Sequence, residues 1–406
     1  MEKFVERDIE KVILPWLDSR EILAIRGPRQ SGKTTLLMKI KDILVGRGEE
    51  VHFLSFEDDL EREKFEANPK EYITYYARDS RKHFFLLDEV QYVKNAGKLL
   101  KLVYDSFENL KIIITGSSTL DMNKVGSFLV GRVLFFPLYP FSFSEFLKAR
   151  DQNAYGNYHE SRLRIASPKE VGTMFLDTLN GLFKEYLIFG GYPKIVLEHD
   201  FEKKKFLLKN LFLTYIEKDI VNVYGVGYKQ KILDLIRILA SQDCSILNFQ
   251  ELCSLTGLYF KELKTILGIL EDTYTIRLVK PFHKNLRTEL RKNPKVYFQD
   301  IGLRNAITGR FDFSEDDFGK LLENGVLSLW REERVNFWRT SSKAEVDFIV
   351  GETIPVEVKV FPKVSRSLRS FLAAYHPGIA IVANWDSSTS LMVEKTKVFF
   401  VPAALL

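Results

Sequence analysis

The chain has 406 residues, and 46% of them are hydrophobic. A typical domain has roughly 100–200 residues, so two to four domains are expected. The 59 Lys and Arg nearly balance the 54 Asp and Glu, so the overall charge neither requires nor excludes nucleic acid. Cys244 and Cys253 lack the ligand spacing of a zinc site, and no stretch is long and apolar enough to span a bilayer. We therefore expect a cytoplasmic protein without membrane contact.

Short apolar runs alternate with longer segments in the first third of the chain. Strands that are buried on both faces of a parallel sheet have such uninterrupted runs, and the segments between them are long enough for crossover helices. The sequence therefore predicts an α/β fold with a doubly wound parallel sheet over residues 1–145. The predicted strands are 22–26, 51–56, 84–87, 112–115 and 133–138.

A phosphate-binding loop follows the first predicted strand. Residues 27–34 have the sequence GPRQSGKT, which fits G-x-x-x-x-G-K-[ST]. The glycines let backbone N–H groups converge on phosphate, and the next helix adds its positive end. We expect Lys33 to reach the β- and γ-phosphates of ATP and Thr34 to bind Mg²⁺. The predicted nucleotide-binding residues are Gly27, Pro28, Arg29, Gln30, Ser31, Gly32, Lys33, Thr34 and Thr35.

Two carboxylates end the third predicted strand, in the sequence HFFLLDEV over residues 83–90. Ligands of such folds bind at the carboxyl edge of the sheet. We expect Asp88 to hold Mg²⁺ through water and Glu89 to orient or deprotonate the attacking water. Together with the loop, the pair predicts an ATP hydrolase.

Polar residues also follow the fourth predicted strand. Thr115 or Ser117 is expected to sense the γ-phosphate or to hold the water, and an ordinary Gly-Ser turn is the equal alternative. Arg132 precedes the fifth strand. It is either a surface residue or an arginine finger that acts in trans in a homo-oligomer.

The remaining chain divides into three predicted segments. Residues 146–227 form a helical lid or adaptor, because apolar residues recur there at three- and four-residue spacing. Residues 228–298 have the order helix, helix, turn, helix and two strands, which is that of a winged helix. Residues 299–406 return to mixed α/β.

A carboxylate group lies in this last segment. Glu323 falls on a predicted helix, Asp347 in EVDFIV, and Glu357 and Lys359 in VEVKV. A hairpin through Gly351 would bring Asp347 beside Glu357. The three carboxylates then become candidate metal ligands, with Lys359 as a further catalytic residue for phosphodiester attack. The alternative is a charged face of a half-exposed hairpin, and a nuclease-like fold can also lack nuclease activity.

Two stretches are candidate DNA contacts. The third helix of the predicted winged helix has only Lys261 and Lys264, whereas residues 283–295 contain Lys284, Arg287, Arg291, Lys292 and Lys295. The second stretch is therefore the better candidate for phosphate contacts. Tyr259 and Phe260 are expected to pack in the core or in the turn.

Several motifs resemble those of the AAA-type P-loop ATPases of archaea and bacteria that carry a C-terminal domain of unknown function. They are GPRQSGKT, LLDEVQ, ITGSS, GR-x4-PLYPFSFSEF, GGYP at 190–193, YIEKDI at 215–220 and YFQDIGLR at 297–304. The resemblance implies a core with strand order 5-1-4-3-2, a helical segment, a winged helix and a restriction-endonuclease-like (PD-(D/E)xK) domain. Lys218 stands where the Y-x-x-R-D pattern has arginine, which weakens any role of that position in planar pairing.

The sequence leaves two functions open. One is a Mg²⁺-dependent ATPase that acts on DNA or is gated by it, with metal-dependent nuclease activity in the C-terminal domain. The other is an ATP-dependent switch that recognises a protein partner and does not process DNA.

Overall fold

The computed structural model describes residues 4–117, 119–161, 172–215, 226–282, 292–351 and 353–406. The chain forms two compact units. Unit 1 is Met1–Pro140 with Asp272–Tyr274, and unit 2 is Phe141–Glu271 with Thr275–Leu406. Each unit is described by itself.

Unit 1 is built on a five-stranded sheet with the order β2-β3-β4-β1-β5, in which every neighbouring pair is parallel. This is the predicted order, counted from the other edge. The strands are β1 Ile22–Arg26, β2 Glu50–Ser55, β3 His83–Asp88, β4 Leu110–Gly116 and β5 Val133–Pro137.

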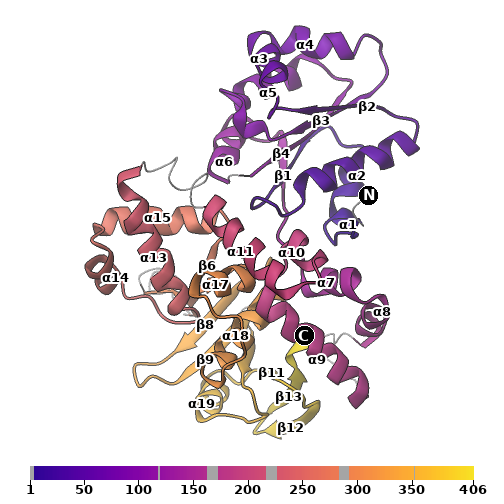
Figure 1. Ribbon diagram of the computed structural model, residues 1–406. Helices are drawn as coiled ribbons and strands as arrows, with labels where there is room; N and C mark the ends of the chain where they lie inside the picture. Colours follow the sequence, from indigo (N-terminus) through magenta and orange to yellow (C-terminus); the bar gives the residue numbers. More distant parts are fainter. Residues whose placement is uncertain (1–3, 118, 162–171, 216–225, 283–291, 352) are drawn as a thin grey trace. The chain divides into compact units, whose positions relative to one another are not determined.

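Helices cover the sheet of unit 1 on both faces (Figure 1). On one face, Leu23 and Ile25 pack with Leu36, Ile40 and other residues of α2. On the other face, the alternating residues of β1 join a second core with α3, α4, α5 and α6. Side chains of a strand alternate between faces, so burial on both faces explains the uninterrupted apolar runs. Each fully buried Leu or Ile contributes roughly 1.5–3 kcal/mol. The helices are α1 Glu10–Ile13, α2 Lys33–Gly46, α3 Asp59–Ala67, α4 Pro69–Tyr76, α5 Ala96–Ser106 and α6 Thr119–Phe128, and the 3₁₀ turns are η1 Leu14–Trp16 and η2 Val90–Tyr92.

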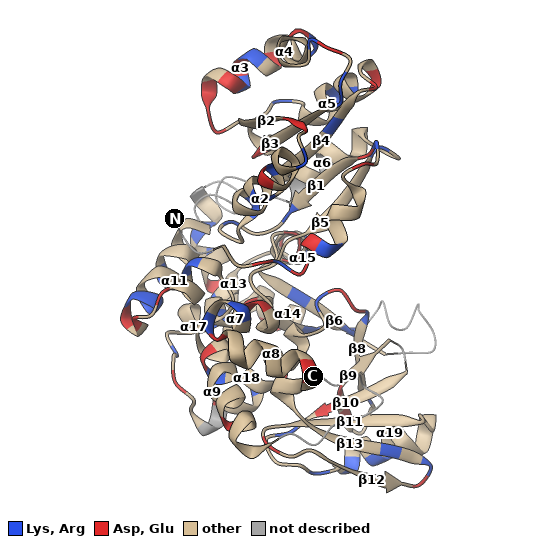
Figure 2. Cartoon of the chain, turned by 90° about the vertical axis from the view of Figure 1, so that its right-hand side faces the viewer, with Lys and Arg blue, Asp and Glu red and all other residues tan. Residues whose placement is uncertain are grey.

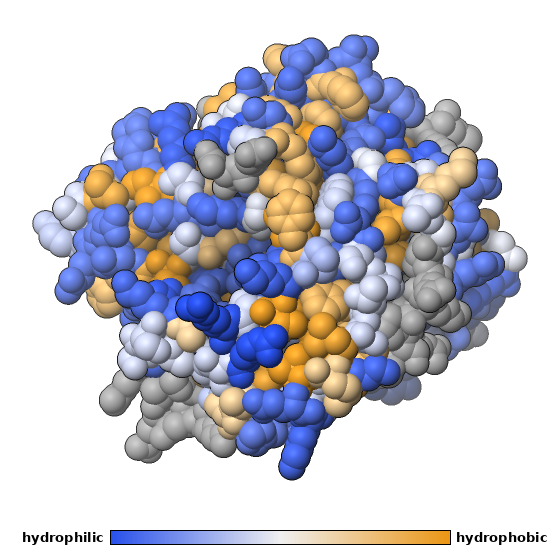
Figure 3. All heavy atoms as spheres, turned by 90° about the horizontal axis from the view of Figure 1, so that it is seen from below, coloured by the Kyte–Doolittle hydropathy of each residue, from blue (hydrophilic) through white to orange (hydrophobic). Residues whose placement is uncertain are grey.

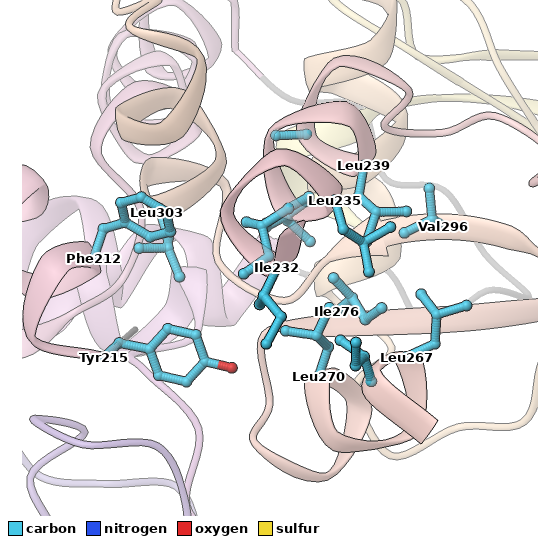
Figure 4. Packing of buried hydrophobic residues seen from close by; sticks show 14 of the residues in the cluster. Phe212, Tyr215, Ile232, Leu235, Leu239, Leu267, Leu270, Ile276, Val296 and Leu303 are labelled. Carbon is cyan, nitrogen blue, oxygen red and sulfur yellow. The ribbon is translucent and has the colours of Figure 1, made fainter. Parts of the chain in front are cut away.

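Unit 2 begins with helices and ends with a sheet. Its helices before the sheet are α7 Phe143–Arg150, α8 Gln152–Ser161, α9 Thr173–Phe189, α10 Pro193–Leu197, α11 Phe201–Tyr215, α13 Lys229–Ser241, α14 Phe249–Thr256 and α15 Phe260–Asp272. Apolar side chains of α11, α13 and α15 meet those of β6 and β7 in one core (Figure 4). The order α13, α14, α15, β6, β7 agrees with the predicted sequence of elements in residues 228–298.

The sheet of unit 2 has eight strands in the order β12-β13-β11-β10-β9-β8-β6-β7. Because β6 pairs with β7 in antiparallel and with β8 in parallel orientation, the sheet continues across the predicted boundary between residues 298 and 299. The strands are β6 Ile276–Pro281, β7 Lys295–Phe298, β8 Val335–Arg339, β9 Glu345–Val350, β10 Ile354–Val358, β11 Ile379–Asn384, β12 Thr389–Val393 and β13 Thr396–Pro402, and the helices are α17 Ile301–Thr308, α18 Glu315–Ser328 and α19 Arg366–Tyr375.

Two of the resemblance motifs, GGYP and YFQDIGLR, contact each other inside unit 2. The carboxylate of Asp300 accepts hydrogen bonds from the backbone N–H of Gly191 at 2.7 Å and of Leu303 at 2.9 Å, so it caps α17 and holds the glycine turn. A Cβ on Gly302 would lie 2.1 Å from the carbonyl oxygen of Phe189. These two motifs therefore have a structural role, since only glycine permits this close approach.

The strands of both sheets are mostly free of charge, and Lys, Arg, Asp and Glu gather on helices and connections (Figure 2). Hydrophobic residues nevertheless reach the surface in patches between hydrophilic ones (Figure 3). Such exposure is normal for folded proteins, so an exposed apolar side chain does not by itself mark a site. Among the described residues, we find no helix long and apolar enough to cross a membrane.

Candidate functional site

The GPRQSGKT loop connects β1 to α2 at the carboxyl edge of the sheet of unit 1. Gln30 and Gly32 have left-handed backbones, with φ of 61° and 94°. A Cβ on Gly27 would lie 2.0 Å from the carbonyl oxygen of Leu138. Both glycines of the motif are thus required, one for its backbone angle and one for the lack of a side chain.

Lys33 is buried at the start of α2, and its Nζ donates to the carbonyl oxygens of Gly27 at 3.1 Å and Pro28 at 2.9 Å. The Oγ of Ser31 is buried and has no hydrogen-bond partner in the described part of the chain. A buried ammonium beside such a hydroxyl, in a loop that opens a helix, fits an anionic ligand such as phosphate. Gln30, Thr34 and Thr35 are exposed on the same loop and first helical turn.

Asp88 ends β3 and joins three elements of the site. Its carboxylate accepts hydrogen bonds from the Thr34 hydroxyl, at 2.9 Å, and from the Thr115 hydroxyl on β4. Burial raises the pKa of Asp88, and the two hydroxyl hydrogen bonds oppose this shift. The two residues predicted to bind Mg²⁺, Thr34 and Asp88, are therefore in direct contact.

Glu89 follows with a left-handed backbone, φ 57°, and its N–H donates to the hydroxyl of Thr115 at 3.0 Å. Its carboxylate accepts a hydrogen bond from Nε2 of Gln91, which also donates to the hydroxyl of Ser117 at 3.0 Å. A Cβ on Gly116 would lie 3.1 Å from Oε1 of Gln91. The nearest atom to that Cβ would be Sδ of Met122, at 2.3 Å, so the glycine between Thr115 and Ser117 makes room mainly for the methionine side chain.

The predicted hairpin is present in unit 2. β9 and β10 are antiparallel around Gly351, and Oδ2 of Asp347 accepts a hydrogen bond from the N–H of Val358 at 2.8 Å. Nζ of Lys359 lies 3.7 Å from Asp347 and 3.3 Å from Glu357. Burial raises the pKa of Glu357, and the nearby Lys359 opposes the shift. The lysine therefore pairs with both predicted metal ligands of the hairpin.

A second lysine, Lys295 of β7, lies at the third predicted ligand. Its side chain is 3% exposed, and its Nζ lies 3.1 Å from Glu323, 2.7 Å from Glu345 and 4.0 Å from Asp347. Burial raises the pKa of Glu323 to about 7. The described residues contain no group of three or more His, Cys, Asp or Glu placed to hold a metal ion. Lys295 and Lys359 thus lie against the carboxylates that the sequence suggested as metal ligands, and joint metal binding by Glu323, Asp347 and Glu357 stays a prediction.

The N-terminal part of the chain matches a known protein family. Residues 19–147 match the model of a family described as an AAA domain. This match, together with the GPRQSGKT loop, supports a P-loop ATPase in this part of the chain. Residues 180–314 match the model of a domain of unknown function, so the ATPase domain is followed by a second family segment.

Full-length relatives share both parts. An uncharacterized protein of Haemophilus influenzae is 28% identical over 350 residues, which are 83% of this chain and 81% of that protein. An uncharacterized protein of Methanocaldococcus jannaschii is 28% identical over 369 residues, which are 86% of this chain and 75% of that protein. The ATPase domain therefore occurs with a similar C-terminal part in a bacterium and an archaeon.

Solved structures that match include two of replication initiators. Domain III of DnaA from Thermotoga maritima is 18% identical, with a TM-score of 0.30 over 51% of this chain and 94% of that chain. DnaA bound to AMPPCP and single-stranded DNA is 16% identical, with a TM-score of 0.32 over 66% of this chain and 89% of that chain. These likenesses are too weak to add to the assignment, which rests on the family match and the loop.

Arg132 lies away from the loop within the ATPase domain. Its carbonyl oxygen accepts from the N–H of Ile22, so it stands at the amino edge of the sheet, and its Nε lies 2.9 Å from Asp105. The loop follows the opposite end of β1. Arg132 is therefore not part of this site in its own chain, and its action in trans stays a prediction.

Sequence reasoning missed two residues of the ATPase domain. Gln91 is part of the LLDEVQ motif, but no spacing rule shows that its amide meets Glu89 and Ser117. Arg7 is buried and donates to the carbonyl oxygens of Ser31 at 2.9 Å and Tyr139 at 2.7 Å, so it supports the phosphate loop from the start of the chain.

One expectation about the candidate DNA contacts is wrong, and another is wrong in part. Lys295 is internal and paired with carboxylates, so it cannot contact phosphate. Tyr259 is 78% exposed and does not pack in the core, whereas Phe260, which is 52% exposed, contacts the ring of Phe249 near the turn. Lys218 and residues 283–291, which hold most of the basic stretch, lie outside the described residues.

Proposed function

We propose that the chain is a Mg²⁺-dependent ATP hydrolase in which Lys33, Thr34 and Asp88 hold MgATP and Glu89 acts on the attacking water. The contact between the Thr34 hydroxyl and the Asp88 carboxylate carries this proposal. It places the expected metal ligands of the loop and of β3 side by side, next to the buried ammonium of Lys33.

When the triphosphate binds, the ammonium of Lys33 would exchange its present hydrogen-bond acceptors for phosphate oxygens. Nζ of Lys33 now donates to two carbonyl oxygens of its own loop, and phosphate oxygens are the stronger acceptors because they are charged. Backbone N–H groups and the start of α2 add to the attraction. Thr34 and Asp88 would hold Mg²⁺, which would supply positive charge to offset the negative charge that develops on the phosphate oxygens.

Glu89 would act on the attacking water because neighbouring residues fix the position of its carboxylate. Its backbone is fixed by Thr115, and its carboxylate is held by Gln91, which is held in turn by Ser117. Thr115 and Ser117 would then be positioning residues for the acidic pair, while their predicted contact with the γ-phosphate or the water stays a prediction. A base fixed in this way needs little reorganisation when the water reacts.

Two substitutions test the roles. Lys33→Ala should weaken ATP binding and abolish turnover. Glu89→Gln should bind ATP normally and lower single-turnover hydrolysis by roughly 10²- to 10⁴-fold, the usual contribution of a general base. A normal rate for Glu89→Gln would remove Glu89 from its role, while the family assignment of the ATPase domain would stand.

We also propose that DNA gates this turnover and that unit 2 binds rather than cleaves it. Lys261 and Lys264 of α15 are exposed, which supports contact with phosphate. The pairing of Glu323 and Asp347 with the buried Lys295 speaks against metal-dependent cleavage, because that lysine has no role in the predicted nuclease site. A protein partner is the alternative trigger. ATPase rates with single-stranded, duplex and branched DNA, with DNA integrity followed in the same tubes, test both points. Cleavage with Mg²⁺ or Mn²⁺ that Asp347→Ala abolishes would restore the nuclease prediction.

A further inference from the structure

The turn between α14 and α15 exposes three large apolar side chains in a short stretch. Leu255 is 59% exposed, Tyr259 78% and Phe260 52%. Of the other large apolar residues of these helices, Phe249 is partly buried and the rest are buried, namely Leu252, Leu263, Ile266, Leu267, Ile269 and Leu270. The buried residues alone pack these helices against the core of unit 2. The three exposed side chains are therefore not needed for that packing and can contact a partner.

Two lysines lie beside these rings. Lys261 and Lys264 are exposed on the first turns of α15. Nζ of Lys264 lies 4.7 Å from the ring centroid of Phe260, and the ring of Phe260 meets that of Phe249 edge to face at 5.9 Å. The Lys264 ammonium and the Phe249 ring therefore restrict the Phe260 ring, which reduces the entropy lost when a partner binds it.

The acidic residue of this stretch is already engaged. The carboxylate of Glu262 accepts from the N–H of Tyr259 and from the hydroxyl of Tyr228, both at 2.9 Å. The backbone hydrogen bond from Tyr259, with that of Tyr228, lowers the pKa of Glu262. Nζ of Lys231 donates to the carbonyl oxygen of Gly257 at 2.8 Å, which fixes the turn from the other side. Tyr259 is thus held at the positive end of α15, where the helix dipole favours an anion.

We infer that Tyr259, Phe260, Lys261 and Lys264 form a binding surface for single-stranded nucleic acid. The two rings stack on unpaired bases, and the two lysines neutralise phosphates of the same strand. A duplex offers no free base faces, and two lysines supply few of the phosphate contacts that duplex binding needs. A standard protein interface needs about 20–30 residues a side, and this stretch offers a few rings and cations. The inference deepens the proposed gating by DNA.

Fluorescence anisotropy of the full chain with a labelled oligothymidylate and with a duplex of equal length tests the surface. Tyr259→Ala with Phe260→Ala should weaken single-strand binding at least tenfold, because stacking on each base contributes about 1–3 kcal/mol and 1.4 kcal/mol is a factor of ten. The salt dependence should not change. Tyr75→Ala, which removes an exposed tyrosine of α4, is the matched control.

The contribution of the two lysines is measured separately, through the salt dependence of binding. Lys261→Gln with Lys264→Gln should weaken binding and reduce the slope of log K against log salt by about 1.4, since each phosphate contact of a single strand contributes about 0.7. Unchanged affinity in both double variants overturns the inference, as does equal binding of duplex and single strand. The inference is also overturned if the aromatic variant no longer binds a protein partner but still binds the oligonucleotide as the unsubstituted chain does.

Binding and turnover are measured separately, so the inference and the proposed gating can fail independently. The aromatic variant should keep its ATPase rate without DNA and lose any stimulation by single strands. The aromatic variant could lose oligonucleotide binding while DNA does not stimulate the ATPase of the unsubstituted chain. That result would support the binding surface and contradict the proposed gating by DNA. Circular dichroism of both double variants should match the unsubstituted chain, because the replaced side chains are exposed.

Discussion

The ammonium of Lys295 lies 3.1 Å from the carboxylate of Glu323, and the hydroxyl of Tyr297 donates to the same carboxylate oxygen at 2.6 Å. The lysine and the tyrosine come from β7 and the glutamate from α18, so the contact joins the predicted winged-helix segment to the C-terminal segment. Nearby Glu323, Asp347 and Glu345 raise the pKa of Lys295 against the effect of burial. A charged lysine therefore lies beside two of the carboxylates, Glu323 and Asp347, that the sequence suggested as metal ligands.

Lys295→Met should destabilise unit 2 strongly. Removal of one partner leaves buried carboxylates without compensation, which costs about 3–5 kcal/mol. Denaturant unfolding measures the loss, and Lys292→Met, which changes an exposed lysine, is the control. A loss below about 1 kcal/mol would place the pair among weak surface ion pairs. If Mn²⁺ without nucleotide stabilised the unsubstituted chain, that would also contradict the role of Lys295 as the cation that neutralises these carboxylates.

The sequence predicted what depends on local pattern and spacing. The apolar runs gave the strands of unit 1 because both faces of that sheet are buried, and the motifs located Lys33, Asp88 and Glu89. Gln91, Arg7 and Lys295 were not predicted in their roles, because each acts through partners that are distant in sequence or through a rotamer. The packing expected for Tyr259 was wrong, since an apolar residue near a helix start can point to the core or to solvent, and only the neighbouring elements decide.

Thr115→Val should impair catalysis more than nucleotide binding. The hydroxyl donates to Asp88 and accepts from the N–H of Glu89, so its loss frees both residues of the acidic pair. We expect kcat to fall by roughly 10- to 100-fold, the usual effect of a small misplacement. ATP affinity, measured by titration in the presence of Mg²⁺, should change little. Thr115→Ser keeps the hydroxyl and should retain most activity; an equal loss in both variants would indicate a packing effect instead.

Gln91 should affect the pH dependence of turnover because its amide contacts the carboxylate of Glu89. Gln91→Leu removes the donor, and kcat should fall roughly tenfold or more. Gln91→Glu instead places a second carboxylate beside Glu89, and like charges raise the pKa of one of them. The acid limb of the kcat profile should therefore move to higher pH. If both variants lower kcat with an unchanged profile, Gln91 has only a packing role.

Asp243 should make the stability of unit 2 depend on pH. Its buried carboxylate accepts from the N–H of Phe298 at 3.1 Å and from the amide of Asn324, yet burial raises its pKa from 3.8 to about 6. Because the folded pKa is the higher one, the protonated carboxyl stabilises the fold below pH 3.8, and this contribution is lost as the pH rises through about 6.

The free energy of unfolding of unit 2 should accordingly fall by up to about 3 kcal/mol over this window, at 1.36 kcal/mol per pKa unit. Asp243→Asn cannot titrate, so it should flatten this part of the profile whatever its absolute stability. Asp312→Asn, which changes an exposed carboxylate, should leave the slope as it is. Unfolding curves in urea at half-unit steps from pH 4 to 7 measure the difference, and parallel profiles for all three proteins would show that Asp243 stays ionised in the folded chain.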